Sequence, residues 1–463
     1  MNFSLNFDRM RCLIYSLIIF SFVYLITACD NKEEFNHDSN FRLDFSKDSI
    51  SFDTIFSGLP STTKQLKIYN RSSKTIQINE ISLENGDNYR LNINGVNGNI
   101  SKNVEIQSKD SLYIFINLNT PDIDQDEPRI IEDHLLFSFN SKILKFRLKS
   151  WTQDVIRFSK NELKTQIWSK GRPYYIEKDL TLEENNKLSI QAGTKIYFQK
   201  GAGLHIRGEL NIEGSYKEPV FLGSSRKEEL YQNVPGQWKG LFFYTESKNN
   251  FISHLQLENS IKGIDAQSEI NNNNLEIEYS KFLNFTKTGI ASNNFNIKMH
   301  DVIISNCGEQ NILLEGNGDF EFSHCNFINY WQISSRTNAC LSYLANETND
   351  KSLKIYNSII YGSNSNELET NYINHIKINN CLIRLNDEKQ NILSSSFESC
   401  IFNTDPNFTN RHKHNYNLTS SSILIDNAKL EFANSYPLDF NGNSRLSDTF
   451  PDIGSFEFMN ETE

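Results

Sequence analysis

The sequence has little positive charge. Its 463 residues carry 46 Lys and Arg side chains against 57 Asp and Glu, a formal net charge of −11 at pH 7. Proteins that bind DNA or RNA need a basic surface, because phosphate contacts supply most of their affinity. Nucleic acid is therefore excluded as a partner. Core-forming residues are not scarce, since 38% of the chain is hydrophobic and 12% aromatic, so the chain is expected to fold.

Motifs for metal binding and for sugar hydrolysis are also missing. The nine histidines show no spacing typical of a metal site, and His412 and His414 flank Lys413 in an expected solvated loop. Residues 403–405 (Asn-Thr-Asp) imitate one motif of the polygalacturonase-like hydrolases. The consecutive aspartates, the Gly-His-Gly motif and the Arg-Ile-Lys motif of that family do not occur. We therefore expect no metal ion and no other cofactor.

The N-terminus has the pattern of an export signal. Arg9 and Arg11 precede a run of uncharged, largely apolar residues at 12–28, which is shorter than the roughly 20 residues of a membrane-spanning helix. Residues 26–29 (Ile-Thr-Ala-Cys) resemble the bacterial lipobox. The resemblance implies that residues 1–28 are a lipoprotein signal peptide and that Cys29 carries a lipid that attaches the protein to a membrane. A plain signal peptide or an uncleaved anchor is the alternative.

The residues after Cys29 bear on where the protein is located. Residues 30–34 (Asp-Asn-Lys-Glu-Glu) resemble the acidic tag of surface-exposed lipoproteins of Bacteroidota. The resemblance implies a cell-envelope protein, held at the outer membrane and exposed at the cell surface. A merely solvated linker is the alternative, since five residues carry little specificity. Residues 29–40 have the composition of a flexible tether.

Residues 41–151 predict a first β domain. Apolar and polar residues alternate over short segments that turn signals separate, which is typical of strands with one wet face. At least seven such strands in about 110 residues have the size and spacing of an immunoglobulin-like sandwich. Residues 52–58 and 66–70 resemble the sandwich modules found ahead of β-helices in Bacteroidota surface lipoproteins. The segment contains no catalytic grouping.

Internal repeats predict the fold of the second part. Several segments place apolar residues at their first and third positions, and their starts are 22, 23, 33 and 23 residues apart. A period near 22 with no helix inside it predicts one turn of a parallel β-helix. We interpret the polar stretch at 332–351 as a loop that leaves one long turn. The five segments are 275–280, 297–302, 320–325, 353–358 and 376–381.

A column of asparagines supports the repeat. Asn259, Asn284, Asn306 and Asn329 occupy one place in consecutive copies. Stacked amides can hydrogen-bond along the axis of such a coil, which gives the column a structural purpose.

Glycines mark the corners of the earlier turns. Gly193, Gly208 and Gly214 follow alternating strands, and we expect a positive φ there. With residues 237–241, this region resembles the entry turns of right-handed pectate-lyase-like β-helices, and the resemblance covers residues 175–430. The expected fold class is therefore all-β, with an immunoglobulin-like β-sandwich followed by a right-handed parallel β-helix. Residues 180–425 correspond to about 11 turns of 22 residues.

The end of the chain carries a separate likeness. Its motifs resemble the C-terminal segment called the choice-of-anchor Q domain. The resemblance implies that residues 431–463 form a cap over the last turns, where exposed strand edges promote aggregation. The motifs are 405–408, 416–418 with 422–428, 439–445, and 452–457.

Catalytic residues on this fold are expected at the outward second position of the repeats, which forms a column along the coil. A lyase of this fold needs a carboxylate cluster that binds Ca²⁺ and an Arg or Lys base. The signs of the column largely alternate, which predicts exposed ion pairs instead. Glu276 and Glu278 share a face and are weak catalytic candidates, because the neighbouring Lys298 and His300 compete for them. The column reads Glu276, Lys298, Glu321, Lys354 and Lys377.

Cysteines and aromatic residues leave two further questions open. Cys381 and Cys400 occupy the same position of successive turns, so a disulfide between them is possible, while buried thiols are the favoured alternative. Tyr356 and Trp331 are candidates for stacking on sugar rings, with packing as the favoured interpretation.

These observations favour a cell-surface lipoprotein whose coil presents an elongated face to a polysaccharide or a surface protein, without catalysis. A polysaccharide lyase or glycoside hydrolase on the same fold, with Ca²⁺ as cofactor of the lyase, is the first alternative. A structural spacer without a groove or an aromatic patch is the second.

Overall fold

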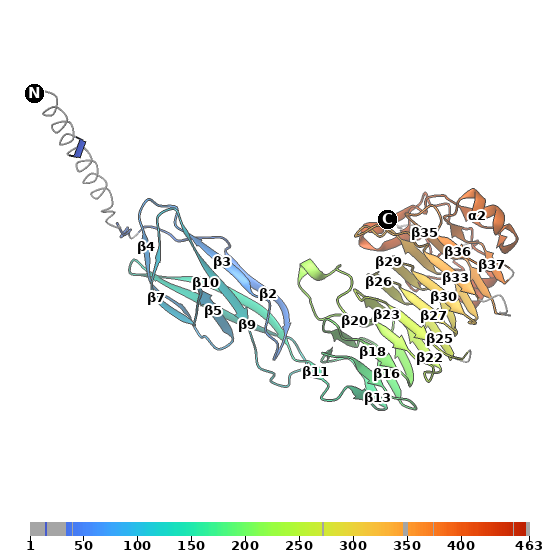
Figure 1. The fold of residues 1–463 in the computed structure, drawn as a ribbon, viewed down its shortest axis with the longest axis horizontal. Helices are drawn as coiled ribbons and strands as arrows, with labels where there is room; N and C mark the ends of the chain where they lie inside the picture. The colour runs from blue at the N-terminus through green and yellow to red at the C-terminus, as the bar shows by residue number, and fades with distance from the viewer. Residues whose placement is uncertain are drawn as a thin grey trace, which may run out of the picture. The chain divides into compact units, whose positions relative to one another are not determined.

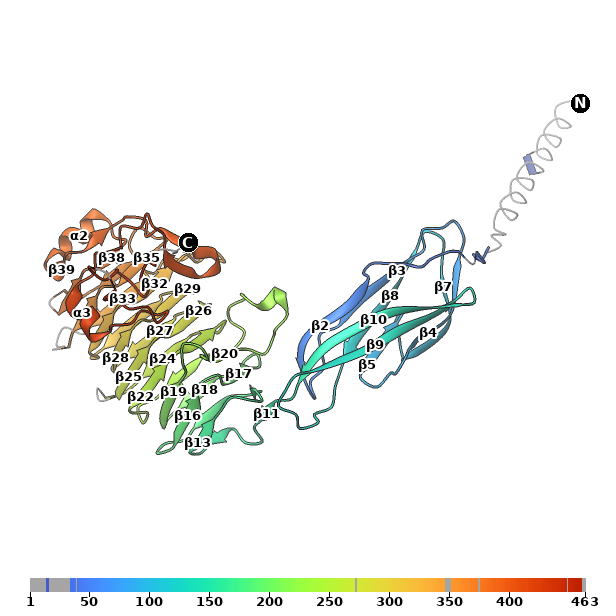
Figure 2. The same cartoon turned by 180° about the vertical axis from the view of Figure 1, so that it is seen from behind.

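The structure is a computed structural model of the chain. It describes residues 14–15, 34–38, 40–270, 273–345, 351–373, 375–447 and 449–459. Most of the predicted signal peptide, the predicted lipidation site Cys29 and the first residues of the tether lie outside the described residues. The chain divides into two compact units, Met1–Pro121 with Arg129–Thr152 and Asp122–Pro128 with Gln153–Glu463. Figures 1 and 2 show that both units are built from strands, as predicted.

The first unit is an antiparallel sandwich. Within residues 40–153, all of them described, the strands form two five-stranded sheets. Side chains alternate between the core and solvent, and Leu66 and Ile114 of one sheet meet Phe137 and Leu148 of the other in one apolar cluster. One sheet contains β1 (Asp44–Phe45), β3 (Lys64–Tyr69), β8 (Ser111–Leu118), β5 (Tyr89–Ile93) and β6 (Val96–Asn97). The other contains β2 (Ser49–Phe56), β10 (Lys142–Gln153), β9 (Arg129–Phe139), β4 (Ile76–Leu83) and β7 (Ile100–Ile106).

The second unit is a parallel β-helix, as predicted. Among the described residues its three sheets, named S1, S2 and S3, have eleven, nine and ten strands. S1 contains β11 (Ile156–Arg157), β14 (Tyr174–Ile176), β17 (Lys195–Phe198), β20 (Val220–Ser224), β23 (Leu255–Glu258), β26 (Lys281–Phe285), β29 (Ile303–Cys307), β32 (Asn326–Asn329), β35 (Ile359–Gly362), β38 (Leu382–Ile383) and β40 (Ile401–Phe402). S2 contains β12 (Glu162–Leu163), β15 (Leu180–Leu182), β18 (Leu204–Ile206), β21 (Leu241–Phe243), β24 (Ile264–Gln267), β27 (Ile290–Asn293), β30 (Ile312–Gly316), β33 (Leu341–Ala345) and β36 (Leu368–Thr370). S3 contains β13 (Gln166–Trp168), β16 (Lys187–Gln191), β19 (Glu209–Glu213), β22 (Asn250–Ser253), β25 (Asn273–Glu278), β28 (Phe295–His300), β31 (Phe320–Ser323), β34 (Leu353–Tyr356), β37 (Ile376–Asn379) and β39 (Phe397–Glu398).

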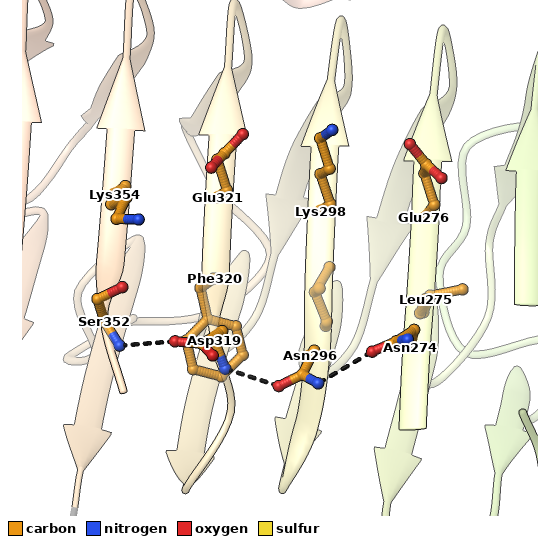
Figure 3. A pocket seen from close by; sticks show the side chains of 11 residues that line it. Asn274, Leu275, Glu276, Asn296, Lys298, Asp319, Phe320, Glu321, Ser352 and Lys354 are labelled. Carbon is orange, nitrogen blue, oxygen red and sulfur yellow. Dashed lines mark hydrogen bonds between the residues drawn. The ribbon is translucent and has the colours of Figure 1, made fainter. Parts of the chain in front are cut away.

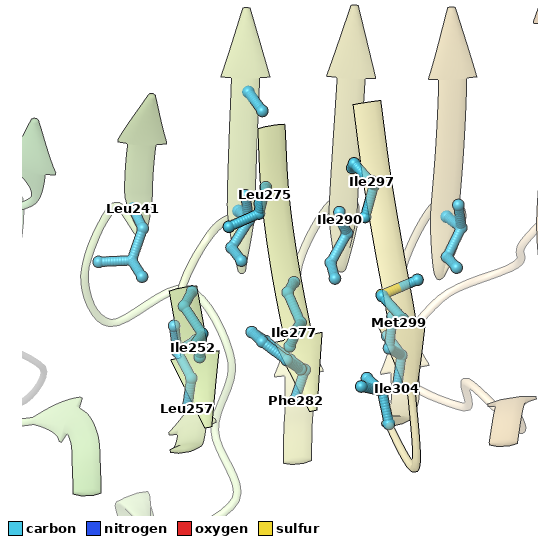
Figure 4. Close-up of a cluster of buried hydrophobic side chains, with 14 of the residues drawn as sticks. Leu241, Ile252, Leu257, Leu275, Ile277, Phe282, Ile290, Ile297, Met299 and Ile304 are labelled. Carbon is cyan, nitrogen blue, oxygen red and sulfur yellow. The ribbon is translucent and has the colours of Figure 1, made fainter. Parts of the chain in front are cut away.

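Each turn passes through S1, S2 and S3 and contributes side chains to one continuous core. Alternate residues of every strand point inward, because successive side chains of a strand lie on opposite faces. Figure 4 shows Phe282 and Ile304 of S1 facing Ile290 of S2 and Ile277 and Met299 of S3. The first and third positions of the sequence repeat are these inward residues, so the repeat was interpreted correctly.

The corner between S3 and S1 repeats in every turn from β22 onward. The residue that follows each of these S3 strands has a positive φ between 43° and 53°, so the backbone bends sharply there. The next residue, the sixth of the repeat, is buried where little room remains, as Ser280 and Cys325 illustrate. The corner residues are His254, Tyr279, Asp301, His324, Asn357, Asn380 and Ser399.

The predicted corner glycines have two different physical reasons. Gly193 has φ +75°, as predicted. Gly208 and Gly214 do not have a positive φ. A Cβ atom at Gly208 would lie 2.2 Å from the Asn186 carbonyl oxygen, and one at Gly214 would lie 2.4 Å from that of His254. These two glycines are needed because a neighbouring turn, the preceding one at Gly208 and the following one at Gly214, approaches too closely for a side chain.

The ends of the coil differ from the expected boundaries. It begins at β11, earlier than the predicted start at 175, because the short strands β11 to β13 already pair in parallel with the next turn. The predicted loop at 332–351 contains β33, so it consists of two connections instead of one. At the far end, α2 (Asp387–Ile392) and η2 (Ser394–Ser396) take the place of a strand of S2, and Leu385 and Leu393 close the core. A further short helix, η1 (Glu229–Tyr231), lies in the loop between β20 and β21.

The C-terminal segment, residues 403–459, lies along the side of the coil. It contains β41 (Phe408–Asn410), η3 (Arg411–Lys413), β42 (Asn415–Leu418) and α3 (Leu430–Ser435). Its side chains Tyr416, Leu424 and Ile453 pack on Ile303 and Ile359, which point outward from S1. The segment therefore covers an apolar strip of S1, and it starts well before residue 431. The sequence predicted a cap over the last turns, but the segment covers the side of S1 instead, because the outward apolar residues of S1 require a cover of their own.

Candidate functional site

The predicted charged column lies on the outward face of S3. Strand pairing places Glu276 beside Lys298, Lys298 beside Glu321, and Glu321 beside Lys354. Lys377 follows next to Lys354. The predicted order of charges is thus confirmed, with one side chain on each strand at the roughly 4.8 Å spacing of neighbouring strands. Figure 3 shows four of these side chains side by side on β25, β28, β31 and β34.

A second row of polar side chains runs parallel to the charged column. The Asn296 amide donates to Asn274 Oδ1 at 2.9 Å, and its own Oδ1 accepts the Asp319 N–H at 2.9 Å. Asp319 Oδ1 in turn accepts the Ser352 N–H at 3.1 Å. Figure 3 shows this chain of hydrogen bonds crossing four turns. These hydrogen bonds hold the N-terminal edge of the S3 strands in place, where the connections from S2 enter the sheet.

The two rows line an open groove of about 420 Å³, here called the S3 groove. The inward residues beneath it, Leu275, Ile297 and Phe320, are each about 1% exposed, so the surface offered to a ligand is polar. Two carboxylates and two ammonium groups alternate along the charged column, and Asp319 adds a third carboxylate from the second row. The lining residues are Asn274, Leu275, Glu276, Asn296, Ile297, Lys298, Asp319, Phe320, Glu321, Ser352 and Lys354.

Lys298 is the central cation of the S3 groove. The neighbouring Tyr436 phenol, from the C-terminal segment, is the main cause of a raised pKa of Lys298, and Glu276 and Glu321 act in the same direction. Partial burial opposes this shift. The ammonium group therefore stays charged between the two carboxylates, where it competes with any metal ion for both of them.

Both carboxylate oxygens of Glu278, the second weak catalytic candidate, accept hydrogen bonds from neighbouring side chains. Ser253 Oγ donates to Glu278 Oε1 at 2.8 Å, and His300 Nε2 donates to Oε2 at 2.9 Å. Burial alone would raise the pKa of Glu278, but these hydrogen bonds and the His300 charge lower it. Tyr436 stacks on the His300 ring at 4.1 Å between centroids. The structure therefore separates Glu278 from Glu276: one is bonded beneath the C-terminal segment, and the other faces the S3 groove.

His300 links Glu278 to a buried ionic network that the sequence interpretation missed. Its Nδ1 lies 3.1 Å from Asp301 Oδ2. Burial lowers the pKa of His300, but the bonds to Asp301 and Glu278 outweigh it and raise the pKa. Asp301 also pairs with Arg445, which donates to Glu457 Oε1 at 2.6 Å. The motifs at 439–445 and 452–457 thus supply the residues that hold the C-terminal segment on the coil.

The remaining candidates, two aromatic residues and two histidines, differ in how far they are buried. Tyr356 is 8% exposed and stacks on Phe432, and Trp331 is 9% exposed and donates from Nε1 to Ser334 Oγ at 2.9 Å. His412 is exposed, but His414 is partly buried, so the expectation of a solvated loop holds only for His412. Tyr356 and Trp331 are therefore packed against the protein and offer no free platform for a sugar ring.

The cysteines of the coil carry free thiols in this structure. Cys381 Sγ donates to the Asn379 carbonyl at 3.2 Å, and Cys400 Sγ donates to the Ile378 carbonyl at 3.3 Å. The possible disulfide between Cys381 and Cys400 is therefore not formed here. Burial raises the pKa of both thiols. Each has a backbone acceptor of its own, as expected for small buried side chains.

The described part of the chain has neither a metal-ligand cluster nor a membrane-spanning helix. No group of three or more His, Cys, Asp and Glu side chains there is arranged to hold a metal ion. No helix in that part is long and apolar enough to cross a membrane.

Comparison with known proteins gives little further information. No family model and no curated protein sequence matches the chain. Among solved structures, the chain is similar to a family 123 glycoside hydrolase from Clostridium perfringens that was analysed for glycolipid glycan hydrolysis. The similarity has 13% identity and a TM-score of 0.18, and it covers 26% of this chain and 25% of that chain. The match spans a quarter of that enzyme, and a likeness at this level carries no argument about function.

Proposed function

We propose that the chain is a lipid-anchored cell-surface protein whose S3 groove binds a polysaccharide without cleaving it. The observation that carries the proposal is the order of charges in the groove, where Lys298 stands between Glu276 and Glu321. This order gives a strip of hydrogen-bonding groups along the coil, and it leaves no pair of carboxylates on adjacent strands of the groove.

The groove suits a linear glycan. Carboxylates accept hydrogen bonds, ammonium groups donate them, and amides do both, so the lining can match a series of sugar hydroxyls. The rungs repeat every 4.8 Å or so, which is close to the length of one sugar unit in an extended chain. A protein partner, the alternative occupant, is expected to insert apolar or aromatic anchors. The S3 groove offers no apolar recess for them, because Leu275, Ile297 and Phe320 point into the core.

The same geometry argues against the enzyme alternative. A lyase needs several carboxylates around Ca²⁺, which acidifies the proton next to a uronate carboxyl group. Each carboxylate of the charged column has an ammonium group on the neighbouring strand instead. A hydrolase needs one carboxylic acid with a raised pKa opposite a second carboxylate. Lys298 stands between Glu276 and Glu321, the two candidates for that pair.

Attachment to the membrane is the second part of the proposal. It rests on residues 9–34 of the sequence, where the lipobox-like segment ends at Cys29. A lipid on Cys29, followed by the tether, would hold the protein at the outer membrane with its two folded units outside the cell. A polysaccharide of the cell surface or its surroundings would then be within reach.

Binding to an array of polysaccharides tests the function, with and without Ca²⁺. We expect retention of at least one polysaccharide, and about tenfold weaker binding of the Lys298→Gln and Glu321→Gln variants, since each loses hydrogen bonds to a charged group. Lys102→Gln, at an exposed ion pair of the sandwich strand β7, is the matched control and should bind normally. Binding to no polysaccharide would favour the spacer alternative. Equal losses in all three variants would show that the S3 groove is not responsible for binding.

A further inference from the structure

A smaller recess lies on the S1 side of the coil, away from the S3 groove. It has a volume of about 210 Å³, enough for a single sugar residue and too small for a chain. Three parts of the sequence meet around it: the loop that contains η1, the connection after β32, and η3 of the C-terminal segment. The residues that matter to the argument are Asn233, Asn284, Asn306, Tyr330, Trp331 and Arg411.

The asparagine column is interrupted at this recess. The amides at its two ends bond to main chain: Asn259 donates to the Gln232 carbonyl at 2.8 Å, and Asn329 donates to the Cys307 carbonyl at 2.9 Å. Between them, Asn284 makes one long bond of 3.4 Å to Asn259. Among the described residues, none bonds the side-chain amide of Asn306. The predicted amide ladder therefore does not continue along the coil, and its two middle members are turned to the recess.

The walls of the recess are held in place. Arg336, in the connection that carries Trp331, donates to both carboxylate oxygens of Glu367 at 2.9 and 2.6 Å, and both side chains are almost fully buried. The η1 loop is tied to the coil by the bond from Asn259. On the third side, Lys281 Nζ donates to the His414 carbonyl at 3.2 Å. A recess with such walls is preorganised, so a ligand loses less free energy to ordering the site.

The charge of the recess is opposite to that of the chain. Among the described residues that line it, none is Asp or Glu, although the chain has a net charge of −11. The Arg411 guanidinium lies 4.7 Å from the centroid of the Tyr330 ring. Burial, with the nearby Lys281 charge, lowers the pKa of His414 to about 4, so its ring is neutral at pH 7. Arg411 is thus the cation that a ligand meets there, next to amides and aromatic rings.

From this arrangement we infer that the recess is a binding site for a single sugar residue that carries a carboxylate or a sulfate group. Arg411 pairs with the anionic group, because a guanidinium forms strong paired hydrogen bonds with such oxygens. The amides of Asn284, Asn306 and Asn233 bond the ring hydroxyls. The Tyr330 ring holds the Arg411 guanidinium over its face, beside the ligand, and Trp331 closes the wall next to it. This site is separate from the S3 groove and does not depend on glycan binding there.

Titration of the purified protein with acidic sugars tests the inference. The probes are glucuronic acid, galacturonic acid, N-acetylneuraminic acid and glucose 6-sulfate, with glucose and inorganic sulfate as comparisons, and oligosaccharides that end in the same residues. Binding is followed by calorimetry and by the fluorescence of the four tryptophans, with Trp331→Phe to assign the signal. We expect at least one acidic sugar to bind about tenfold more tightly than glucose and than sulfate, since the site uses both charge and hydroxyls.

Three variants decide the outcome. Arg411→Gln and Asn306→Ala should each weaken binding about tenfold while the melting temperature stays unchanged. Lys413→Gln, in the same short helix but outside the lining, should bind normally. Free sugar and oligosaccharide ends binding equally would assign a monosaccharide site, and binding of the ends alone would assign a chain-end site. No saturable binding, equal competition by sulfate, or an equal effect of Lys413→Gln would overturn the inference.

Discussion

Arg445 and Asp301 form an ion pair in which both side chains are fully buried, although 144 residues separate them in the sequence. Asp301 stands at the corner between S3 and S1, and Arg445 belongs to the C-terminal segment. Glu457 accepts a hydrogen bond from the guanidinium as well, and His300 approaches Asp301 from the other side. This network joins the end of the chain to the middle of the coil, next to the S3 groove.

Removing Arg445 should release the C-terminal segment. Arg445→Met removes the guanidinium that Asp301 and Glu457 share in the buried network, which costs about 3–5 kcal/mol of stability. Urea unfolding and limited proteolysis measure the effect, and cleavage is expected first within residues 403–459. The control is Lys145→Met, at an exposed ion pair with Glu84, which should change little. If both variants resist urea and protease equally well, the network does not hold the segment.

The segment should be attached more firmly at mildly acidic than at alkaline pH. Burial raises the pKa of Glu457 to about 8, against roughly 4.3 in an unfolded chain, so the folded state binds more protons between these values. Stability from this group is therefore present below about pH 4.3 and is lost as the pH rises through 8. The raised pKa of His300 acts in the same direction.

Melting temperatures between pH 5.5 and 8.5 check this pH dependence. The native protein should lose a few degrees over this range. Glu457→Gln keeps an acceptor for Arg445 but cannot ionise, so its melting temperature should depend less on pH. A variant as pH-dependent as the native protein would exclude Glu457 as the cause.

Deleting one whole turn should preserve the fold. Residues 188–209 form one turn that lies outside the cluster packed under the C-terminal segment, and their removal brings Leu210 to the register position of Leu188. We expect a folded β protein by circular dichroism and protease resistance, whereas removal of 188–198 should unfold the coil. Deletion of 297–319 removes Asp301 and should keep the coil but release the C-terminal segment. Equal resistance of the full-turn and half-turn deletions would contradict the repeat.

The protein should not cleave polysaccharides. Incubation with pectin, alginate, chondroitin and heparin in the presence of millimolar Ca²⁺ is expected to give neither unsaturated products nor new reducing ends. The reason is that Lys298 and His300 occupy the carboxylates that would bind the cation. Turnover above roughly 1 s⁻¹, a typical enzyme rate, that Glu276→Gln or Glu278→Gln abolished without unfolding would establish the enzyme alternative instead.

Lipid attachment should depend on Cys29. Because a thioether needs the thiol, Cys29→Ser should leave an unlipidated precursor that a fatty-acid analogue does not label. Labelling is read on a gel after expression in a bacterium that processes lipoproteins. Cys12→Ser is the matched control and should be labelled like the native protein. A labelled Cys29→Ser variant would disprove the assignment.

The sequence by itself determined the coil and the order of charges on S3. Inward and outward residues alternate along each strand, and the pattern returns after about 22 residues, so local periodicity places Lys298 between Glu276 and Glu321. The apolar runs on S1, such as Ile359 to Tyr361, also indicate a cover over this sheet, because strands covered on both faces are apolar throughout.

Only the tertiary structure decided what covers S1 and which carboxylates are engaged. Asp301 and Arg445 belong to different repeats and segments, and no periodicity relates them, so their pairing appears only when the C-terminal segment packs on the coil. The same holds for the recess beside Asn306, whose walls come from three separate loops. Strand pairing repeats in a regular register that the sequence displays, so the predicted charged column was correct. Contacts between loops occur at a single place and leave no repeating pattern, so the predicted cap was misplaced.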